Sequence, residues 1–513
     1  MNNRKSLTIF IILILLLVIF HFVVRTDYSF TADSLMKAIQ TQSLIINKYA
    51  SFHLANNVLL MDKSFETFLF KDSFALPVNA NLYSVFSDMF ALISSLFRIL
   101  SFPFEIFPFL ASLPFAVSMA FLVSKGKVSW QTSLTVFFGS IIFPLCFEFS
   151  ENGLFFLLNT IGFYYWLEYL QSSLDDKRTE FLLYSIFAVS LSVWFRLESI
   201  LFILSLFIAL FFARREVFID LLKKKSLLFL VIGLIPLFFL FVWNFTNYGH
   251  ILGLRYIFNY GAGNITVLDR IINLLSISFF YFDGVPRIGM LMYSSFFLIP
   301  VFYFAKKREK GTEETFLLWV TVVFMLFVGF TSPNNGITIN GRYQLLVILP
   351  LSRMMQLWSD AQSEQKKSKL VIALVSFSVL FSAVAVSVLK YAYGRQREAR
   401  VILQNIKTDS YVVPNSFLCN MIGLEHLAKP VFCIKNETSI DLIDQIIKGN
   451  KSLKIVTLFN FDEKKNKPFI DSNSALNPSH QESLIKRMET NCKKADKIED
   501  MGFTLQRFVC ENE

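Results

Sequence analysis

Charged residues are scarce in this sequence: Asp, Glu, Lys and Arg make up 17% of its 513 residues, whereas a soluble globular domain carries about 25%. Hydrophobic residues make up 54%, and the chain has 60 Phe. This composition excludes an ordinary soluble protein and indicates a chain that crosses a membrane. The formal net charge is +10, but Lys and Arg fall in short runs between apolar segments, which is the pattern that sets membrane topology. We therefore expect no nucleic-acid partner.

Histidine and the glycine motifs of nucleotide sites are also lacking. The chain has 5 His, and no His, Cys and Asp residues have the spacing of zinc ligands. No P-loop and no Gly-rich dinucleotide turn occurs. We predict no zinc site, no nucleotide-sugar site and no certain cofactor, and leave open a divalent cation near Asp33. The internal repeat that marks many secondary transporters is absent as well.

Cysteine is rare and unevenly placed. Cys146 lies in an apolar segment, and the other four lie beyond residue 395: Cys419, Cys433, Cys492 and Cys510. Four cysteines in a short tail predict two disulfides and an oxidising compartment, with the pairing left open. The alternative is four free buried thiols.

Long apolar runs are what the sequence has in abundance. They recur at 6–24, 104–123, 132–149, 152–170, 181–195, 198–213, 226–243, 289–304, 315–330, 343–358 and 369–390. Because about 20 apolar residues span a bilayer, the runs predict about eleven transmembrane helices. The first run follows a basic start but lacks a small-residue cleavage site, so we expect a retained helix rather than a signal peptide.

The basic residues between these runs predict the orientation. They cluster in every second connection: Arg4 and Lys5; Lys125 and Lys127; Lys177 and Arg178; Arg214, Arg215 and 223–225; 306–310; 366–369. By the positive-inside rule these connections and the N-terminus face the cytoplasm. An odd number of spans places the cysteine-containing tail outside, and we expect a bacterial inner membrane with a periplasmic tail.

The expected fold is therefore mainly α, a polytopic membrane protein with a transmembrane domain at 1–394 and a small outer α/β domain at 395–513. In the tail, 452–461 predicts a buried strand, 439–449 an amphipathic helix and 462–468 a loop. Between 25 and 103 the chain stays outside. There, 32–51 and 81–100 predict amphipathic helices at the membrane interface. The second is alternatively a true span, although Asp88 and Arg98 interrupt it.

Several ionisable residues gather on the same outer side, at the ends of apolar runs or in the outer loops. They are Glu151, Arg196, Glu198, Arg255, Asp283, Arg287 and Arg342. Ionisable groups at membrane depth are costly and usually face a cavity, so their convergence on one side predicts a functional site.

Over residues 1–390 these features resemble the GT-C class of integral membrane glycosyltransferases, and most of all its protein-mannosyltransferase and aminoarabinose-transferase branch. The segments that carry the resemblance are "TADSLMKAIQ", "PVNANLYSVFSDMFALISSLFRILSF", "FSENGLFFLLNTIGFYYWLEYL", "WFRLESILFILSLFIAL" and "GRYQLLVILPL". They are similar to the acid-bearing first-loop helix, the second interfacial helix, the second acidic loop, the "RPE" span start and the "RYLLPLLPL" segment. Two positions depart from the pattern. Ser34 follows Asp33 where a second acid is common, and Leu197 replaces the Pro of "RPE".

The resemblance implies transfer of a sugar from a polyprenyl-phosphate donor in the membrane to a hydroxyl of a glycan, lipid or protein. It assigns the catalytic carboxylate to Asp33, which would take the proton of the acceptor hydroxyl. Arg342 and Arg196 would bind the donor phosphate, because the planar guanidinium matches phosphate oxygens. Glu151 and Glu198 would serve the acceptor or the second acidic loop.

Each of these residues also has an ordinary structural interpretation. Asp33 suits the first turn of a helix, with Lys37 as a surface partner. Arg342 can extend its charge to the interface, and Arg196 can pair with Glu198 or Glu151. Two other functions stay open: a lipid or glycan transporter, which would need ionisable groups at the bilayer midplane, and an O-antigen ligase or polymerase, whose long loop comes late in the chain.

Overall fold

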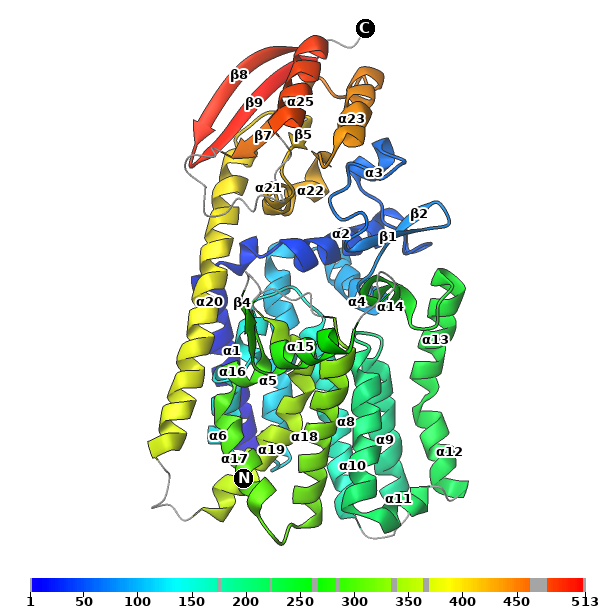
Figure 1. Cartoon of the computed structure of the whole chain (residues 1–513), viewed down its shortest axis with the longest axis vertical. Coiled ribbons are helices and arrows are strands. Elements are labelled where there is room, and N and C mark those ends of the chain that lie inside the picture. Colours follow the sequence, from blue (N-terminus) through cyan, green and yellow to red (C-terminus); the bar gives the residue numbers. More distant parts are fainter. Residues whose placement is uncertain are drawn as a thin grey trace. The chain divides into compact units, whose positions relative to one another are not determined.

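The computed structural model describes residues 2–172, 177–221, 224–260, 266–282, 286–333, 339–362, 369–461 and 478–510. Asp283 and the loop expected at 462–468 lie outside these residues. The chain forms two compact units (Figure 1). Unit 1 contains 1–24 and 108–389, and unit 2 contains 25–107 and 390–513. The division differs from the expected one at 394, because the long first loop belongs with the tail rather than with the membrane helices.

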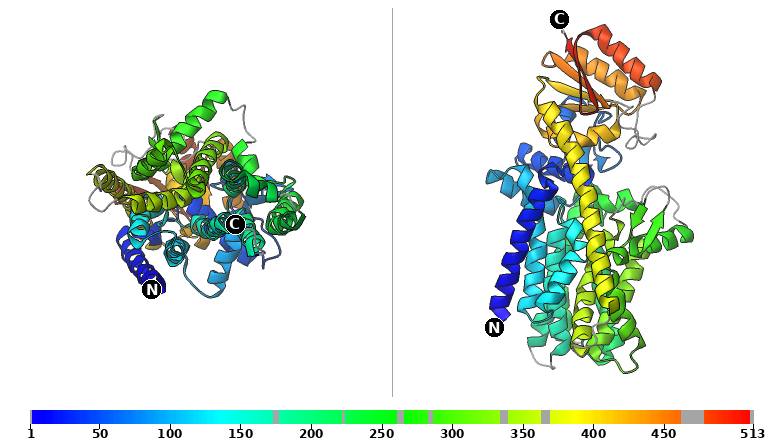
Figure 2. Two further views of the ribbon diagram at one scale, coloured as in Figure 1. Left: turned by 90° about the horizontal axis from the view of Figure 1, so that it is seen from below. Right: turned by 90° about the vertical axis from the view of Figure 1, so that its left-hand side faces the viewer.

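Unit 1 is almost entirely helical, and most of its helices run alongside one another (Figure 2). Its first elements are α1 (Asn2–Val24), α5 (Phe107–Ser124), α6 (Trp130–Phe138), α7 (Ile142–Leu145), α8 (Asn152–Gln171), α9 (Lys177–Ser192), α10 (Glu198–Ala213), α11 (Arg215–Leu221), α12 (Lys224–Gly233), α13 (Ile235–Tyr248) and α14 (Gly253–Tyr260). Then follow α15 (Val267–Ser278), β3 (Phe280–Phe282), β4 (Pro286–Ile288), α16 (Met290–Tyr293), η3 (Ser295–Phe297), α17 (Leu298–Lys306), α18 (Thr312–Thr331), η4 (Asn340–Val347), α19 (Ile348–Ala361) and the first part of α20 (Lys369–Gln404).

Within the described residues, five helices are long and apolar enough to cross a membrane: Arg4–Val24, Phe104–Ser124, Ser226–Tyr248, Thr312–Thr331 and Lys369–Gln404. Shorter apolar helices include Thr179–Ser192, Glu198–Ala213 and Ser295–Lys306. The membrane-protein architecture is confirmed, but the count of eleven spans is not.

Four of the predicted spans are divided rather than continuous: 132–149, 226–243, 289–304 and 343–358. In each, a proline lies in the first turn of the later helix: Pro144 in α7, Pro236 in α13, Pro300 in α17 and Pro350 in α19. Proline lacks an N–H and clashes with the preceding turn, so it is favoured in the first turn of a helix and costly in the interior, where α5 nevertheless holds Pro114. The prolines therefore explain where these apolar runs break.

The two ends of unit 1 differ in their charges. At one end Lys127 Nζ lies 2.8 Å from Glu168 Oε1 near the end of α8. Arg353 Nε lies 2.7 Å from Glu313 Oε1 at the start of α18, and its Nη1 donates to the Lys127 carbonyl at 2.8 Å. The basic connections therefore gather at this end, and Glu151 and Glu198 stand at the opposite ends of α8 and α10. This agrees with the expected alternation of charges, while the orientation in a membrane stays a prediction.

Unit 2 combines the first loop with the tail. The first loop contributes η1 (Thr26–Tyr28), α2 (Ala32–Ile46), α3 (Asn57–Met61), β1 (Ala75–Val78), β2 (Asn81–Ser84), α4 (Asp88–Ile99) and η2 (Phe104–Ile106). After the end of α20, the tail contributes β5 (Ser410–Val413), α21 (Ser416–Met421), α22 (Glu425–Ala428), β6 (Val431–Cys433), α23 (Glu437–Gly449), β7 (Ile455–Phe461), α25 (Pro478–Asn491), β8 (Cys492–Asp500) and β9 (Phe503–Cys510).

A five-stranded sheet in the order β6-β5-β7-β9-β8 forms the centre of unit 2. β6 and β7 pair with β5 in parallel, and β9 runs antiparallel to both β7 and β8. Residues of α23 and α25 pack on one face, with Ile440, Ile443 and Leu484 among them. The other face packs against α2 and the end of α20, with Leu35 and Leu403 fully buried. The expected α/β tail is confirmed, including its strand at β7 and its helix at α23.

The first loop matches the expected helices in part. The first predicted helix is α2. The second begins later than predicted, because 81–84 forms strand β2 instead. β1 and β2 pair with a two-residue loop in which Asn79 and Ala80 have φ of 48° and 64°, as a tight hairpin turn requires. The Ser87 hydroxyl then accepts from the Phe90 N–H at 3.1 Å and starts α4.

Both disulfides expected in the tail are present. One joins Cys419 of α21 to Cys433 of β6, and the other joins Cys492 to Cys510 across β8 and β9. Cys146 is a free buried thiol in unit 1. The sequence predicted the pairs by number and left the pairing open.

Candidate functional site

Helix starts and one 3₁₀ segment bring ionisable side chains together at the end of unit 1 opposite the basic connections. Glu151 immediately precedes α8, and Glu198 is the first residue of α10. Arg196 lies in the turn before α10, and Tyr343 lies in η4, which packs against α8, α15 and α18. The ends of apolar helices are where a charged side chain costs least, so this end can hold several of them.

Arg196 and Glu198 form a buried ion pair in this site. Nη2 and Nε of Arg196 donate to Glu198 Oε1 at 2.6 and 3.3 Å. Nη1 donates to Oδ1 of Asn152, the first residue of α8, at 2.6 Å. The residues Arg196 and Glu198 are only 3% and 8% exposed. A buried charge is tolerated when it is paired and hydrogen-bonded, so this network fixes the position of the Glu198 carboxylate.

Arg255, from α14, joins the same group of charges. Its Nη1 lies 3.3 Å from Oε1 of Glu151, a residue that is 2% exposed. Burial by itself lowers the pKa of Arg255, but the nearby carboxylates Glu198 and Glu151 outweigh it and raise the pKa above its ordinary value. Arg255 therefore stays charged although it is enclosed.

Tyr343 contacts two of the arginines through its ring. The guanidinium carbons of Arg196 and Arg342 lie 5.3 and 5.5 Å from the ring centre, within the range of a cation–π interaction. Among the described residues, the group thus sets the three cations Arg196, Arg255 and Arg342 against the two carboxylates of Glu151 and Glu198. An excess positive charge in a water-poor site favours an anionic ligand.

A cavity of about 470 Å³ opens beside these residues. Its polar lining includes Glu198, Arg255, Arg270 and Tyr343. Its apolar lining includes Leu201, Phe241, Leu252 and Phe330. A ligand with a charged group attached to an apolar chain matches this division.

The structure brings together five of the ionisable residues predicted from the sequence, but it gives them different surroundings. Glu198 lines the cavity, whereas Arg196 is not among the described residues that line it. Glu151 holds Arg255, and Arg342 contacts the Tyr343 ring.

Arg270 is a residue that the sequence analysis missed. It lies in α15, whose first turn is capped by Thr266 and Asp269. The capping pattern T-x-x-D was a usable signal for a helix there, but α15 is too short and too polar to stand out among the apolar runs.

Asp33, the predicted catalytic residue, belongs to unit 2. It is the second residue of α2 and is half-buried. Lys37, one turn later, does not lie at the surface as we considered: it is 3% exposed, and its Nζ lies 4.7 Å from the centre of the Phe86 ring. Gln40 of α2 donates to Asp88 Oδ1 at 3.0 Å and so links α2 to the start of α4. Asp33 thus stands on a helix that is anchored within its own unit.

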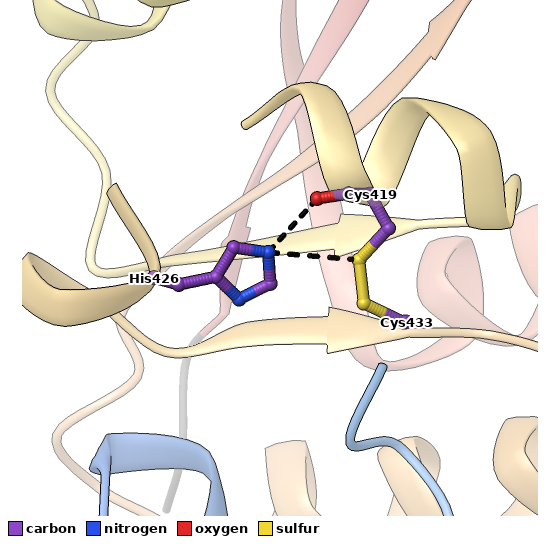
Figure 3. Close-up of side chains that lie close together, drawn as sticks. All are labelled: Cys419, His426 and Cys433. Atoms are coloured by element: carbon purple, nitrogen blue, oxygen red, sulfur yellow. Dashed lines mark hydrogen bonds between the residues drawn. A yellow bond between two sulfur atoms is a disulfide. The ribbon is translucent and has the colours of Figure 1, made fainter. Parts of the chain in front are cut away.

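Cys419, Cys433 and His426 form a separate buried cluster in unit 2 (Figure 3). His426 Nε2 lies 2.8 Å from the Cys419 carbonyl oxygen and 4.0 Å from its sulfur. Because a carbonyl only accepts, Nε2 carries the hydrogen. Burial lowers the pKa of His426 to about 4, against the smaller effect of this hydrogen bond. The two sulfurs are bonded to each other, so the cluster is a disulfide beside a neutral imidazole.

Comparisons with known proteins identify the fold. No protein-family model matches the sequence, and no curated protein matches it. Two solved structures of ArnT from Cupriavidus metallidurans do match. The apo structure has a TM-score of 0.59 at 8% identity and covers 99% of this chain and 98% of ArnT. The structure with bound undecaprenyl phosphate has a TM-score of 0.56 at 10% identity and covers 97% of both chains. This chain therefore has the GT-C fold of ArnT, as the sequence resemblance led us to expect.

Proposed function

We propose that this protein transfers a sugar from a polyprenyl-phosphate donor to a hydroxyl acceptor at the outer face of a bacterial inner membrane. The observation that carries the proposal is the cavity in unit 1, whose lining combines Arg255 and Arg270 with apolar side chains. A polyprenyl-phosphate has the same division into a charged group and an apolar chain. The ArnT structure of the same fold was solved with undecaprenyl phosphate bound.

We assign the donor phosphate to Arg255 and Arg270, which line the cavity, and to Arg342, which contacts the lining residue Tyr343. When the bond between the sugar's anomeric carbon and the phosphate oxygen breaks, negative charge develops on the departing lipid phosphate. Guanidinium groups that are already in place stabilise this charge without reorganising. Arg196, which the resemblance also assigns to the phosphate, is engaged by Glu198 and Asn152. We therefore give it the role of positioning Glu198.

The acceptor hydroxyl is activated by Asp33. Its proton passes to the Asp33 carboxylate while the acceptor oxygen forms the new bond to the anomeric carbon. A positioned base of this kind contributes about 10²- to 10⁴-fold to a rate. Glu151 and Glu198 hold arginines in the structure, and either one can in addition orient a hydroxyl of the sugar or of the acceptor.

The test is turnover of a polyprenyl-phosphate sugar by the purified full chain in lipid nanodiscs. We compare the wild type with Asp33→Asn and with the control Asp27→Asn, which removes a nearby acid in η1. We expect at least a 100-fold loss of turnover in Asp33→Asn with donor binding unchanged, and wild-type turnover in the control.

Three other results would contradict parts of the proposal. Equal turnover in the wild type and Asp33→Asn would remove Asp33 from the mechanism. Unchanged donor binding in Arg255→Gln, measured against Arg353→Gln at the opposite end of unit 1, would remove the phosphate assignment. If the wild type neither bound nor turned over any donor, a transporter would become the better interpretation.

A further inference from the structure

Unit 2 contains a second pocket with arginines, which the transfer reaction does not use. Its volume is about 270 Å³. Arg98 of α4 and Arg400 of α20 line it together with Gln42 and Glu105, and its apolar lining includes Phe104 and Leu427. All these residues belong to one compact unit, so the pocket is a feature of unit 2 alone.

Arg98 is held in place by its neighbours, but few of its N–H donors form hydrogen bonds with the described residues. Its Nη1 donates to the Phe102 carbonyl at 2.7 Å, and its guanidinium carbon lies 4.7 Å from the centre of the Phe104 ring. Its Nε is buried without a hydrogen-bond partner among the described residues. A guanidinium has five N–H donors, so a contact at the end of a helix accounts for one of them and leaves the others for a ligand.

Arg400 of α20 is likewise held by one polar contact and one aromatic ring. Its Nη2 lies 2.8 Å from Glu105 Oε1, and its guanidinium carbon lies 5.7 Å from the centre of the Tyr28 ring. Its Nε is also buried without a partner in the described part of the chain. Two arginines against one glutamate leave one positive charge in excess. Two guanidinium groups fixed by rings, with unused donors, suit a tetrahedral oxyanion better than they suit a structural ion pair.

The surroundings of Arg98 indicate where such an anion comes from. On the last turn of α4 and just beyond it, Leu96, Ile99 and Leu100 are 52%, 57% and 68% exposed. An amphipathic helix with exposed apolar residues beside an arginine is typical of a helix lying among lipid headgroups. There the abundant tetrahedral oxyanion is the phosphate of a phospholipid, and an anionic phospholipid carries no headgroup cation that the arginines would repel.

We propose that this pocket, formed by Arg98, Arg400, Gln42 and Glu105, binds the phosphate group of an anionic membrane lipid. It is distinct from the donor cavity of unit 1. Because the proposal concerns binding alone, it does not depend on the transfer activity.

Native mass spectrometry of the detergent-solubilised full chain tests it with three probes: phosphatidylglycerol, phosphatidylcholine and inorganic phosphate. The wild type is compared with Arg98→Gln/Arg400→Gln. The matched control is Lys448→Gln/Arg487→Gln, which removes two positive charges from the outer helices α23 and α25. We expect the wild type and the control to bind phosphatidylglycerol at least tenfold more tightly than phosphatidylcholine. We expect the arginine variant to lose this preference.

Inorganic phosphate separates the sources of the anion. If it binds and displaces the lipid at submillimolar concentration, the pocket takes free phosphate and the lipid assignment is wrong. Equal retention of phosphatidylglycerol by the wild type and the arginine variant would overturn the whole proposal. Glu105→Gln provides a second test, because it removes the one carboxylate and should strengthen binding of the lipid severalfold. Unchanged or weaker binding in that variant would also contradict the pocket.

Discussion

Burying the charges of Arg196 and Glu198 costs free energy, which their mutual attraction and their hydrogen bonds must offset. Removing one charge leaves the other buried and uncompensated, which costs about 3–5 kcal/mol, whereas replacing both with apolar residues of similar size is often nearly neutral. We therefore predict that Arg196→Met destabilises the protein more than Arg196→Met/Glu198→Met does. Thermal unfolding of the purified variants in one detergent measures the difference.

Arg196→Met should be the more destabilised variant because Glu198 accepts two hydrogen bonds from Arg196 and is only 8% exposed at the start of α10. Asn152, which holds the third arginine contact, gives the matched control. Asn152→Ala should cost about 1.5–3 kcal/mol, the range for a hydrogen bond to a charged group. If the single and the double methionine variants unfold at the same temperature, the pair is not coupled as described.

His426 makes the stability of unit 2 depend on pH. Its pKa is about 4 in the folded protein against an ordinary value of 6.5. The unfolded chain therefore binds a proton between these values and the folded chain does not, so stability falls as the pH drops from 6.5 to 4. The loss is at most about 3 kcal/mol, since one pKa unit is 1.36 kcal/mol.

Hydrogen exchange of the backbone at 410–433 in the full chain measures this effect. In the wild type, the free energy of opening should fall between pH 7 and pH 4. In His426→Gln, which keeps an N–H donor for the Cys419 carbonyl, the fall should be smaller by up to about 3 kcal/mol. The same pH dependence in both proteins would show that His426 does not titrate on unfolding.

At the scale of the element, the sequence predicted helices where apolar residues recur on one helical face. α23 follows this rule, since the Asn436 side chain accepts from the Ser439 N–H and the buried residues Ile440, Ile443 and Ile447 fall on one face. The continuous apolar runs were less informative. They do not show that a new helix begins near Pro144, Pro300 and Pro350. The hydropathy of a segment does not depend on whether its residues have a backbone N–H, which proline lacks.

These divided runs still connect the two ends of unit 1. The Ser129 N–H, just before α6, donates to Gln356 Oε1 at 2.7 Å near the basic end, and the run ends before Glu151. Likewise η4 begins beside the cavity at Tyr343, and α19 continues to Arg353 at the basic end. An apolar run can therefore reach from one end of unit 1 to the other without an unbroken helix, and the runs at 132–149, 289–304 and 343–358 are not among the five long apolar helices.

The two disulfides are the elements that we expect to stabilise the tail most. They close loops with sequence separations of 14 and 18 residues, and the loop-closure relation gives about 3 kcal/mol for a loop of about that length. We predict that Cys492→Ala/Cys510→Ala opens β8 and β9, since β8 is an edge strand that pairs only with β9 among the described strands.

Proteolysis of the tail in the folded protein measures this opening. Loss of about 3 kcal/mol raises the open population by more than a hundredfold, and cleavage follows that population when opening is fast. Cys146→Ala is the matched control, because Cys146 is a free thiol in unit 1. Equal cleavage rates for all three proteins would show that the β8–β9 disulfide contributes little.

At the scale of the whole molecule, the sequence identified several residues that lie together in unit 1, and their role as a functional site stays a prediction. Glu151, Arg196 and Glu198 were recognisable because each stands at the end of an apolar run. The grouping of the first loop with the tail was not recognisable. It rests on contacts such as those of Leu35 in α2 with the core that contains Leu403 and Phe459. Residues this far apart in the sequence leave no local pattern that links them.

The last prediction concerns the sidedness of the chain. Basic residues 306–310 precede α18, and Met501, at the turn between β8 and β9, is 49% exposed. Between them the chain runs along α18 to the cavity end, returns through η4 and α19, and leaves through α20. We expect this path to cross the membrane three times and Arg308 and Met501 to face opposite sides, with Arg308 in the cytoplasm by the positive-inside rule. With a membrane-impermeant thiol reagent on spheroplasts, Met501→Cys should therefore react at once and Arg308→Cys only after lysis.

The wild type, whose one free cysteine is buried, supplies the background. Labelling of both sites before lysis would mean an even number of crossings between them, and labelling of Arg308→Cys alone would reverse the orientation of the whole chain.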